Sequence, residues 1–407
     1  MTFKGYLGKV SINSVLICTI LAVGCSGGGD EAADTTAVPD MSSPRWGHTA
    51  TLLDDGRVLI VGGKAKAYGE VASAEIFDPS NNTWSLAASP TEPRGEGQNT
   101  ILLGDNVLLF GGTDTNVAEL YDPTSDSWTV TGNMVASRSW APATILSDGR
   151  VLVAGGEDFS KGGRTMLDSS EIYDPSTGEW SSAGVMASIH AGHSEVFVDG
   201  KVLIVGQYNG EIYDPATDTW SVTVKTVEER ALGSTATLLN NGKVLVTGGE
   251  FQQEGWGGLY GGAIVNMDGT EIYDPSSGTW VAAAPMTERR KYHSALLMKD
   301  GKVIVVGGMQ IETYDPAQNV WSLAGNMRAD RGELYSATLL KDGKILVVGG
   351  KVINEEDNPK RVKGRTVAEI EKRLEQQSIT LPISPSPLGN YVGATTVGNL
   401  VFLSGHG

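Results

Sequence analysis

The chain has 407 residues and a formal net charge of −17, with 48 acidic against 31 basic side chains. This length can bury a large core, whereas the acidic balance excludes a protein that binds nucleic acid through a basic surface. We expect the negative charge to keep the protein soluble or to attract basic partners.

The first 24 residues are predicted to be a signal peptide. Lys4 and Lys9 precede an apolar run at 15–23, which has the length of a signal-peptide core. The run leads into Leu21-Ala-Val-Gly-Cys25, which resembles the lipobox of bacterial lipoproteins, where the cysteine receives a lipid after cleavage. An ordinary secretory signal is the alternative.

Cys25 is therefore the predicted lipidation site, and residues 25–44 are predicted to be a flexible acidic tether. Cys18 lies in the predicted leader, so we expect no disulfide within the mature chain. Ser26 resembles the outer-membrane sorting pattern, which implies a lipid-anchored, extracytoplasmic protein at the outer membrane of a bacterial cell envelope. No later stretch is long enough for a transmembrane helix.

From Arg45 onward one pattern repeats: a leading Arg, two apolar runs, a glycine pair, Glu-Ile-Tyr-Asp-Pro and a Trp. The glycine pairs begin at Gly62, Gly111, Gly155, Gly206, Gly248, Gly307 and Gly349. The closing tryptophans are Trp84, Trp128, Trp180, Trp220, Trp280 and Trp321. A spacing of about 40–60 residues is the range in which propeller blades repeat.

Each copy is predicted to form four antiparallel strands, which make one blade. Asp54-Asp55-Gly56 lies between the two apolar runs of the first copy and is typical of a tight hairpin turn. Asp-Pro begins a second turn, between the last two strands. We expect the glycine pair to end the second strand where no side chain fits, and the Trp to pack between blades.

These residues resemble the kelch repeat over Arg45 to Gly350, which implies an all-β kelch-type β-propeller, usually a binding scaffold. The fourth copy departs, with Gly206-Gln207 for the glycine pair and His190 for the leading Arg. Six copies are complete, and a half copy follows Arg331. We favour seven blades, with residues 35–41 pairing with the last one, over six blades with an appended hairpin.

The spacer after the glycine pair is long in copies one, three and five, and it must emerge on the same face as the links between blades. Clustered insertions mark a candidate binding face. The fifth insertion carries Phe251, Trp256 and Tyr260, which suit sugar or peptide contact or cover the rim of the propeller.

The leading arginines open each copy near the same face, so Arg138 and Arg290 are candidates for holding acidic groups. A glutamate repeats with every arginine, and we favour a structural ion pair in each blade over this ligand role. Trp46, Trp140, Tyr292 and His293 follow the arginines and are candidate lining residues.

After a predicted linker at 351–364, residues 365–407 resemble the first third of a RidA-like domain, on Asn390-Tyr-Val and Leu403-Ser-Gly-His. That family forms small trimers that act on imine-like intermediates, but its substrate-binding residues lie mostly beyond this fragment. Residues 367–374 are predicted to form an amphipathic helix. We expect a loosely packed fragment or, alternatively, strands that fill the edge of blade seven.

The leading functional hypothesis is a membrane-anchored, monomeric binding module for a protein or glycan of the envelope, without catalytic residues. One alternative is a carbohydrate-active enzyme similar to galactose-oxidase-like copper radical oxidases. The chain has five histidines and no cysteine in the propeller, so we predict no metal and no cofactor. A second alternative is imine or enamine deamination by the RidA-like segment.

Overall fold

The computed structural model describes residues 18–22, 34–65, 69–112, 114–190, 194–198, 200–230, 232–252, 264–327, 332–351, 393–397 and 400–404. They fall into two units, Met1–Ile353 and Asn354–Gly407, which we treat separately. Among the described residues, no helix has the length and apolar character needed to cross a membrane.

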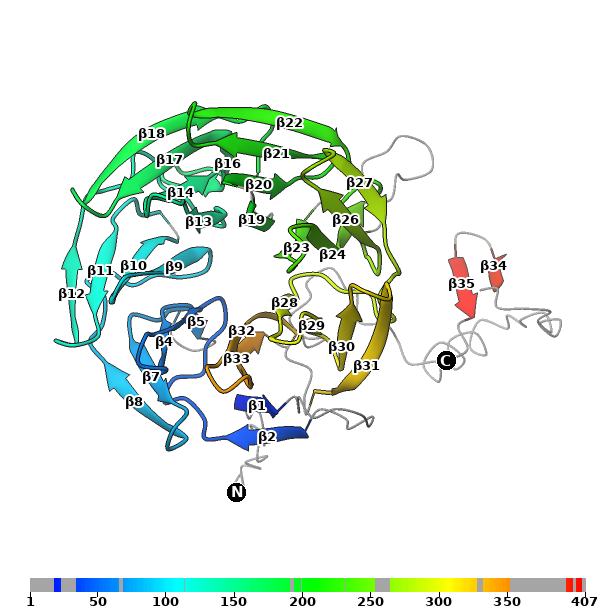
Figure 1. The fold of residues 1–407 in the computed structure, drawn as a ribbon. Coiled ribbons are helices and arrows are strands. Elements are labelled where there is room, and N and C mark those ends of the chain that lie inside the picture. The colour runs from blue at the N-terminus through cyan, green and yellow to red at the C-terminus, as the bar shows by residue number, and fades with distance from the viewer. Residues whose placement is uncertain are drawn as a thin grey trace, which may run out of the picture. The chain divides into compact units, whose positions relative to one another are not determined.

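The first unit is a ring of four-stranded antiparallel sheets (Figure 1), six of which use consecutive segments of the chain. Blades 1 to 3 are β3 (Thr49–Leu52), β4 (Val58–Val61), β7 (Ala74–Asp78) and β8 (Thr83–Ala87); β9 (Gln98–Leu103), β10 (Asn106–Gly111), β11 (Glu119–Asp122) and β12 (Ser127–Val130); β13 (Ala143–Ile145), β14 (Val151–Ala154), β17 (Ser169–Asp174) and β18 (Glu179–Val185).

Blades 4 to 6 are β19 (Ser194–Val198), β20 (Lys201–Val205), β21 (Asn209–Asp214) and β22 (Thr219–Lys225); β23 (Leu232–Leu238), β24 (Val244–Gln252), β26 (Thr270–Asp274) and β27 (Thr279–Ala282); β28 (Ser294–Leu297), β29 (Val303–Val306), β30 (Gln310–Asp315) and β31 (Val320–Asn326). The predicted four-stranded propeller blades are confirmed. The hairpin glycines, such as Gly56 with φ 92°, have the positive φ that the turn prediction required.

The seventh sheet joins the two ends of the propeller. Its order is β32 (Glu333–Leu339), β33 (Ile345–Lys351), β1 (Cys18–Ala22) and β2 (Asp34–Val38). β2 confirms that the segment before Arg45 supplies an outer strand. β1 pairs with β33 and covers its exposed edge, and β2 pairs with β1, so two strands of this sheet precede the predicted start of the propeller at Arg45.

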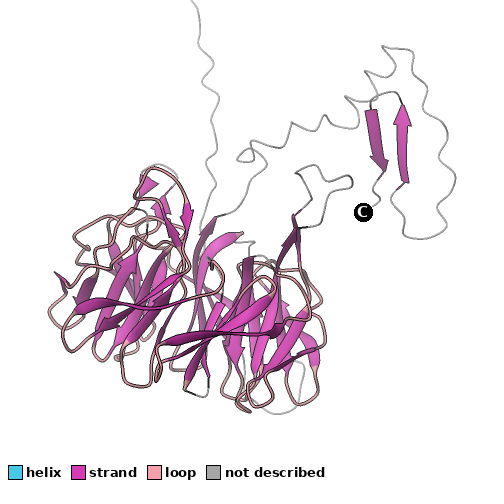
Figure 2. Cartoon of the chain, turned by 90° about the horizontal axis from the view of Figure 1, so that it is seen from above, coloured by secondary structure: helices cyan, strands magenta, loops and turns pink. Residues whose placement is uncertain are grey.

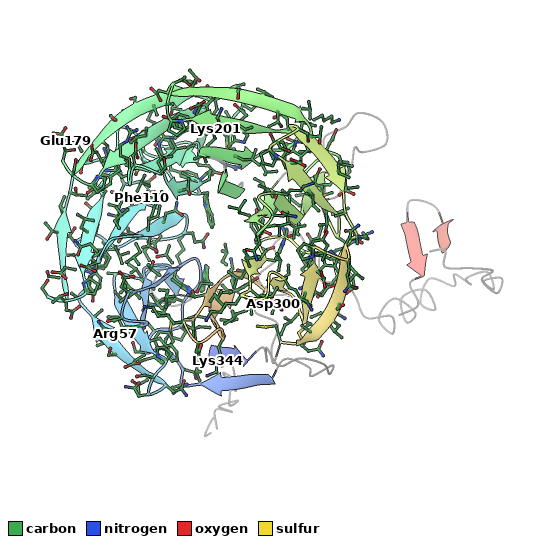
Figure 3. The ribbon with its side chains drawn as sticks, in the orientation of Figure 1. Arg57, Phe110, Glu179, Lys201, Asp300 and Lys344 are labelled. Carbon is green, nitrogen blue, oxygen red and sulfur yellow. The ribbon has the colours of Figure 1, made fainter. Side chains whose placement is uncertain are left out.

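The core consists of apolar clusters between successive blades. In the second strand of a blade both faces are buried, as in Val58–Val61 and Val303–Val306. The predicted packing of tryptophans between blades is confirmed, since Trp128 Nε1 donates to Ala88 O of blade 1 at 2.7 Å. In Figure 3, Phe110 lies inside blade 2, whereas Glu179 lies at the outer rim.

The first glycine of each pair lies against the next blade, as predicted. At Gly111 a Cβ atom would lie 2.5 Å from Arg138 O, and at Gly155 it would lie 2.1 Å from His190 O. Both glycines also have positive φ angles, of 71° and 64°. Glycine is required here because the backbone of the next blade occupies the space of a side chain.

The second unit contains one described hairpin, β34 (Gly393–Val397) and β35 (Leu400–Ser404). These strands pair with each other in a sheet of their own. Both alternatives for this segment, a loosely packed fragment and strands that fill the edge of blade 7, stay predictions. The predicted helix at 367–374 lies outside the described residues.

Candidate functional site

In the six complete repeats, a buried ion pair joins the leading Arg or His to the glutamate of the third strand. The five described Arg–Glu pairs have N–O distances of 2.7–3.0 Å and are Arg45–Glu75, Arg94–Glu119, Arg138–Glu171, Arg230–Glu271 and Arg290–Glu312. The glutamate also accepts backbone N–H groups from the link between blades, as Glu171 does from Val135 and Ala136. The predicted structural ion pair is confirmed.

The ligand role predicted for Arg138 and Arg290 is corrected by this geometry. Their side chains are only 1% and 2% exposed. Arg138 also donates to the carbonyl oxygens of Gly155 and Ser169, at 2.7 and 2.8 Å. Burial therefore keeps both guanidinium groups away from a ligand at the surface, and each is already bonded to a glutamate of its own blade.

His190 takes the place of the arginine in blade 4, and its Nε2 lies 2.9 Å from Glu211 Oε1. Burial by itself would raise the pKa of Glu211. The hydrogen bonds from His190 and from the backbone of Ala187 and Ser188 outweigh burial and hold this pKa below its ordinary value. The departure seen in the fourth repeat therefore keeps the architecture of the pair but changes its chemistry.

The insertions after the glycine pairs emerge beside the leading segments, as predicted. They form β5 (Lys64–Ala65) with β6 (Gly69–Glu70), β15 (Glu157–Asp158) with β16 (Thr165–Met166), and β25 (Ile264–Asn266) beside β24. Isolated bridges join Trp46 to Lys64 and Ser139 to Glu157. Figure 2 shows short strands that project from one side of the disc. Insertions and links thus share one face.

On this face, the residues just before the inner strands surround the axis of the ring (Figure 1). We call this surface the axial face and define it by Trp46, Trp140 and Tyr292 with the charged side chains that contact them. All three aromatic side chains are half-buried. Trp46 Nε1 donates to Glu96 Oε1 at 2.8 Å, and Lys351 Nζ lies 5.6 Å from the centre of the Trp46 ring.

A belt of backbone hydrogen bonds supports the aromatic residues. Trp140 N donates to Gly97 O, and Tyr292 N donates to Gly233 O, both at 2.8 Å. Trp140 and Tyr292 have φ angles of 58° and 50°, at positions where other repeats use glycine, such as Gly47 with φ 64°. A left-handed conformation costs a bulky residue about 1–2 kcal/mol. Such strain is concentrated at functional sites.

Charged groups from several blades converge on Tyr292. Burial raises its pKa above the ordinary value, and Glu250, Glu333 and Glu157 add to the shift while Lys291 opposes it. These carboxylates belong to blades 5, 7 and 3. Tyr292 thus lies within electrostatic range of carboxylates that are distant in sequence.

His293, predicted to line the same face, is instead an internal residue. Its side chain is buried, and its Nε2 lies 2.7 Å from Thr247 Oγ1 in blade 5. Burial, together with Arg290 and Arg230, lowers its pKa to about 3. His293 is therefore a neutral link between blades and does not contact a ligand at the surface.

Of the three candidates in the fifth insertion, the structure describes only Phe251. It lies on β24, is half-buried and pairs with Val265 of β25. Trp256, Tyr260 and the lipidation candidate Cys25 lie outside the described residues. Their roles stay predictions.

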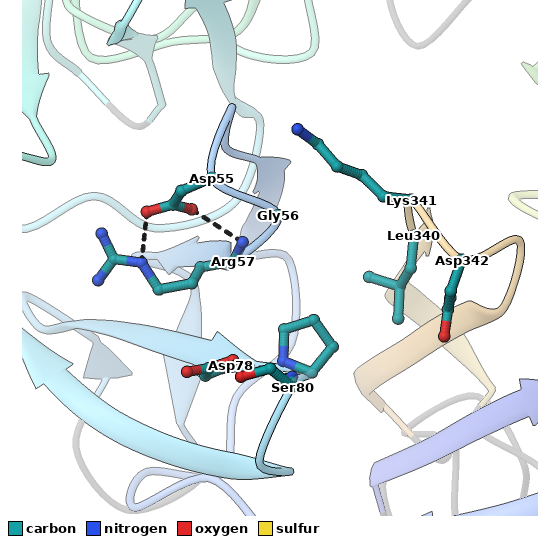
Figure 4. A pocket seen from close by; sticks show the side chains of 9 residues that line it. Asp55, Gly56, Arg57, Asp78, Ser80, Leu340, Lys341 and Asp342 are labelled. Carbon is teal, nitrogen blue, oxygen red and sulfur yellow. Dashed lines mark hydrogen bonds and ion pairs between the residues drawn. The ribbon is translucent and has the colours of Figure 1, made fainter.

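The opposite face contains a shallow cavity of about 410 Å³ between the turns of blades 1 and 7 (Figure 4). Its polar groups already have partners: Arg57 Nε donates to Asp55 at 2.6 Å, and Lys341 Nζ donates to Asp54 O. Asp78 accepts from the amide and hydroxyl of Ser80. We favour the axial face as the functional site, because these turn residues form ordinary local turns.

Sequence reasoning missed the charged members of the axial face: Glu96, Glu157, Arg164, Glu250, Lys291, Glu333 and Lys351. Lys64 is a further member. Glu96 and Glu333 both follow Arg-Gly, and Glu157 and Glu250 both follow a glycine pair, but each of these positions has the same residue in only a few copies, so the signal was weaker than that of the Arg–Glu pair. Trp140 and Tyr292 carried one, since they stand where other copies have glycine.

Comparisons with known proteins agree with the fold. The family model of the Kelch motif matches residues 45–91. Kelch-like protein 23 of Mus musculus is 40% identical over 67 residues, which cover 14% of this chain and 12% of the relative. Galactose oxidase of Gibberella zeae is 28% identical over 98 residues, which cover 22% of this chain and 12% of the relative. Each match therefore spans only a small part of these relatives.

Two solved structures share the architecture. A fungal alcohol oxidase of the AA5 family, in complex with copper, has a TM-score of 0.61 at 18% identity and covers 78% of this chain and 77% of its own. YjhT has a TM-score of 0.55 at 16% identity and covers 70% of this chain and 99% of its own. The protein is a β-propeller with a Kelch motif at residues 45–91; the structural likenesses show the fold alone.

The likeness to a copper protein raises the question of a metal site. In the described part of the chain, no group of three or more His, Cys, Asp or Glu side chains is arranged to hold a metal ion. His48, His190 and His293 contact Ser336, Glu211 and Thr247, respectively. The described residues therefore do not match a copper site.

Proposed function

We propose that this chain is a tethered binding module of a bacterial cell envelope and that its axial face takes a protein or glycan partner. The observation that carries the proposal is the pair Trp140 and Tyr292, both held in a left-handed conformation on the face with the insertions. An aromatic residue in this left-handed conformation makes the fold less stable than glycine at the same position would. Contact of the aromatic ring with a partner accounts for an aromatic residue at this position.

The binding test uses the full chain on a glycan array and in a pull-down from envelope extract. Trp140→Ala should weaken any specific interaction at least tenfold, whereas Leu86→Ala, on the exposed outer strand of blade 1, should leave it unchanged. A partner that binds both variants equally well would place the interaction elsewhere. The absence of any specific partner would contradict a binding module.

Tethering through Cys25 is part of the proposal and has its own test. Cys25→Ser should abolish incorporation of a labelled fatty acid and release the protein from the membrane fraction. Cys18→Ser is the matched control, since this cysteine precedes the predicted cleavage site. Labelling that persists in Cys25→Ser would contradict lipidation at this residue.

A further inference from the structure

The charged side chains of the axial face are paired with one another. Arg164 contacts both carboxylate oxygens of Glu157, at 2.6 and 2.7 Å. Lys291 Nζ lies 3.1 Å from Glu250 and 3.2 Å from Glu333. Lys64 Nζ lies 4.0 Å from Glu96, which also accepts from the Trp46 indole.

Among the described residues, the charged groups that form ion pairs or contact the aromatic rings here balance one another, although the chain is strongly acidic. The described charged groups that contact the aromatic residues or one another here are four cations and four carboxylates: Lys64, Arg164, Lys291 and Lys351, and Glu96, Glu157, Glu250 and Glu333. Their formal charges cancel, whereas the whole chain carries −17.

We propose that the axial face selects an uncharged, hydroxyl-rich ligand, a neutral saccharide, over an acidic or basic one. This inference rests on the proposed function, namely that this face binds a partner. It assigns the chemical class of that partner from the neutral, internally paired charges and the three aromatic side chains.

A charged ligand would have to displace an existing ion pair. The side chains of Glu157 and Glu250 are only 10% and 9% exposed, so the loss of Arg164 or Lys291 would leave a nearly buried carboxylate without its cation. The paired charges of the face offer a charged ligand no excess of the opposite charge that would compensate for breaking the ion pair.

A neutral saccharide faces neither cost. Its C–H faces can pack on the rings of Trp46, Trp140 and Tyr292, while its hydroxyl groups donate to the glutamates and accept from the lysines without breaking a pair. Because a neutral saccharide brings no net charge to the axial face, its affinity should depend little on the salt concentration.

The test measures binding of the purified full chain to neutral oligosaccharides and to the same oligosaccharides carrying a carboxylate or a sulfate. We expect the acidic forms to bind at least tenfold more weakly. The affinity for the neutral form should change less than twofold between 50 and 500 mM NaCl. A preference for the acidic form, or a steep loss of affinity with salt, would overturn the inference.

Two variants separate the inference from the proposed function. Trp140→Gly removes the ring and relieves the left-handed strain, so it should raise the melting temperature while abolishing binding. If Trp140→Gly binds as well as the unmodified chain does, the proposed function is contradicted. If Trp140→Gly loses binding but the unmodified chain prefers acidic oligosaccharides, only the assignment of a neutral saccharide is contradicted.

Glu96→Gln removes one negative charge and keeps an acceptor for the Trp46 indole. It removes one negative charge from the paired groups of the face, so it should raise the affinity for the acidic oligosaccharides several-fold relative to the affinity for the neutral form. An equal effect on both forms would contradict charge selection.

Discussion

At the scale of single residues, the repeated Arg–Glu pair has one exception that tests its energetics. Glu171 and Glu211 occupy equivalent positions and accept the same backbone N–H groups of the preceding link. Their side-chain partners differ, since Glu171 is bonded to Arg138 and Glu211 to His190. Guanidinium stays protonated in proteins, whereas imidazole can release its proton.

We predict that Glu171→Gln lowers the free energy of unfolding by about 3–5 kcal/mol, because it leaves a buried guanidinium without a counter-charge. Glu211→Gln should cost only about 1–2 kcal/mol, because it weakens a hydrogen bond to His190 without leaving a buried guanidinium unpaired. Urea unfolding of both variants measures the difference. Equal losses would show that the charge of the arginine is not the deciding factor.

His293 gives the propeller a dependence of stability on pH. Its pKa is lowered to about 3 in the folded protein from an ordinary 6.5, so the unfolded chain binds a proton over a range in which the folded protein does not. Stability is therefore complete above pH 6.5 and decreases as the pH falls through this range. The lowered pKa values of Glu211 and Glu312 act below about pH 4.5, outside the upper part of the range.

Between pH 7 and pH 5 we expect His293 to reduce the free energy of unfolding by about 2 kcal/mol. His293→Gln retains a hydrogen-bonding group for Thr247 but does not titrate, so its stability should change correspondingly less. Chemical denaturation of both proteins at the two pH values measures the effect. The same decrease in both would exclude His293 as its source.

At the scale of elements, the glycine pair determines how closely one blade approaches the next. Gly111 ends β10 at the seam with blade 3, where Arg138 O would lie 2.5 Å from a Cβ atom. Gly149 lies in a hairpin turn with a similar positive φ, of 86° against 71°, but has no atom within 4 Å of a Cβ position. A comparison of substitutions at these two glycines therefore distinguishes the cost of a positive φ from the cost of close packing between blades.

We predict that Gly149→Ala costs about 1–2 kcal/mol, from its positive φ alone. Gly111→Ala should cost about 1–3 kcal/mol more, because blades 2 and 3 must also move apart. Thermal unfolding of the two variants gives the comparison. A cost for Gly111→Ala no greater than that for Gly149→Ala would show that the seam adjusts freely.

At the scale of the whole molecule, one segment has two assignments. Residues 18–22 lie in the predicted leader, yet they form β1, which separates β33 from β2 in the seventh sheet. Cleavage before Cys25 would remove β1 and leave the edge of β33 without this partner. Export as a lipoprotein and closure of the ring through β1 therefore exclude each other in one molecule.

We predict that the chain of residues 25–407 exchanges the backbone amides of β33 faster than the full chain does, because Thr19, Ile20 and Leu21 no longer pair with it. β29, the equivalent strand of blade 6, is the internal control and should not change. Hydrogen exchange resolved by peptide measures both strands. Equal protection of β33 in the two chains would show that ring closure does not depend on β1.

The repeat made much of the fold predictable from sequence. Strand pairs, Asp-Gly turns, the tryptophan seam and the Arg–Glu pair, as in Arg45 and Glu75, involve residues at a fixed spacing within one copy, and each copy repeats the signal. Only part of the candidate site was accessible in this way. Trp46, Trp140 and Tyr292 were predicted to line one face, whereas His293, predicted beside them, is buried. For Arg138 and Arg290 the favoured ion pair was right, and the alternative ligand role does not fit their burial.

The sequence by itself therefore determined a ring of four-stranded blades and the face that bears the insertions, because hydrogen bonding and side-chain alternation within a blade are local. Only the tertiary structure decided which side chains meet at the axis. Glu157 and Glu333 belong to other blades than Tyr292, so only ring closure brings their charges within electrostatic range of it. Ring closure likewise decided that β1 and β2 complete the seventh sheet, since the free edge of β33 requires a partner whatever its place in the sequence.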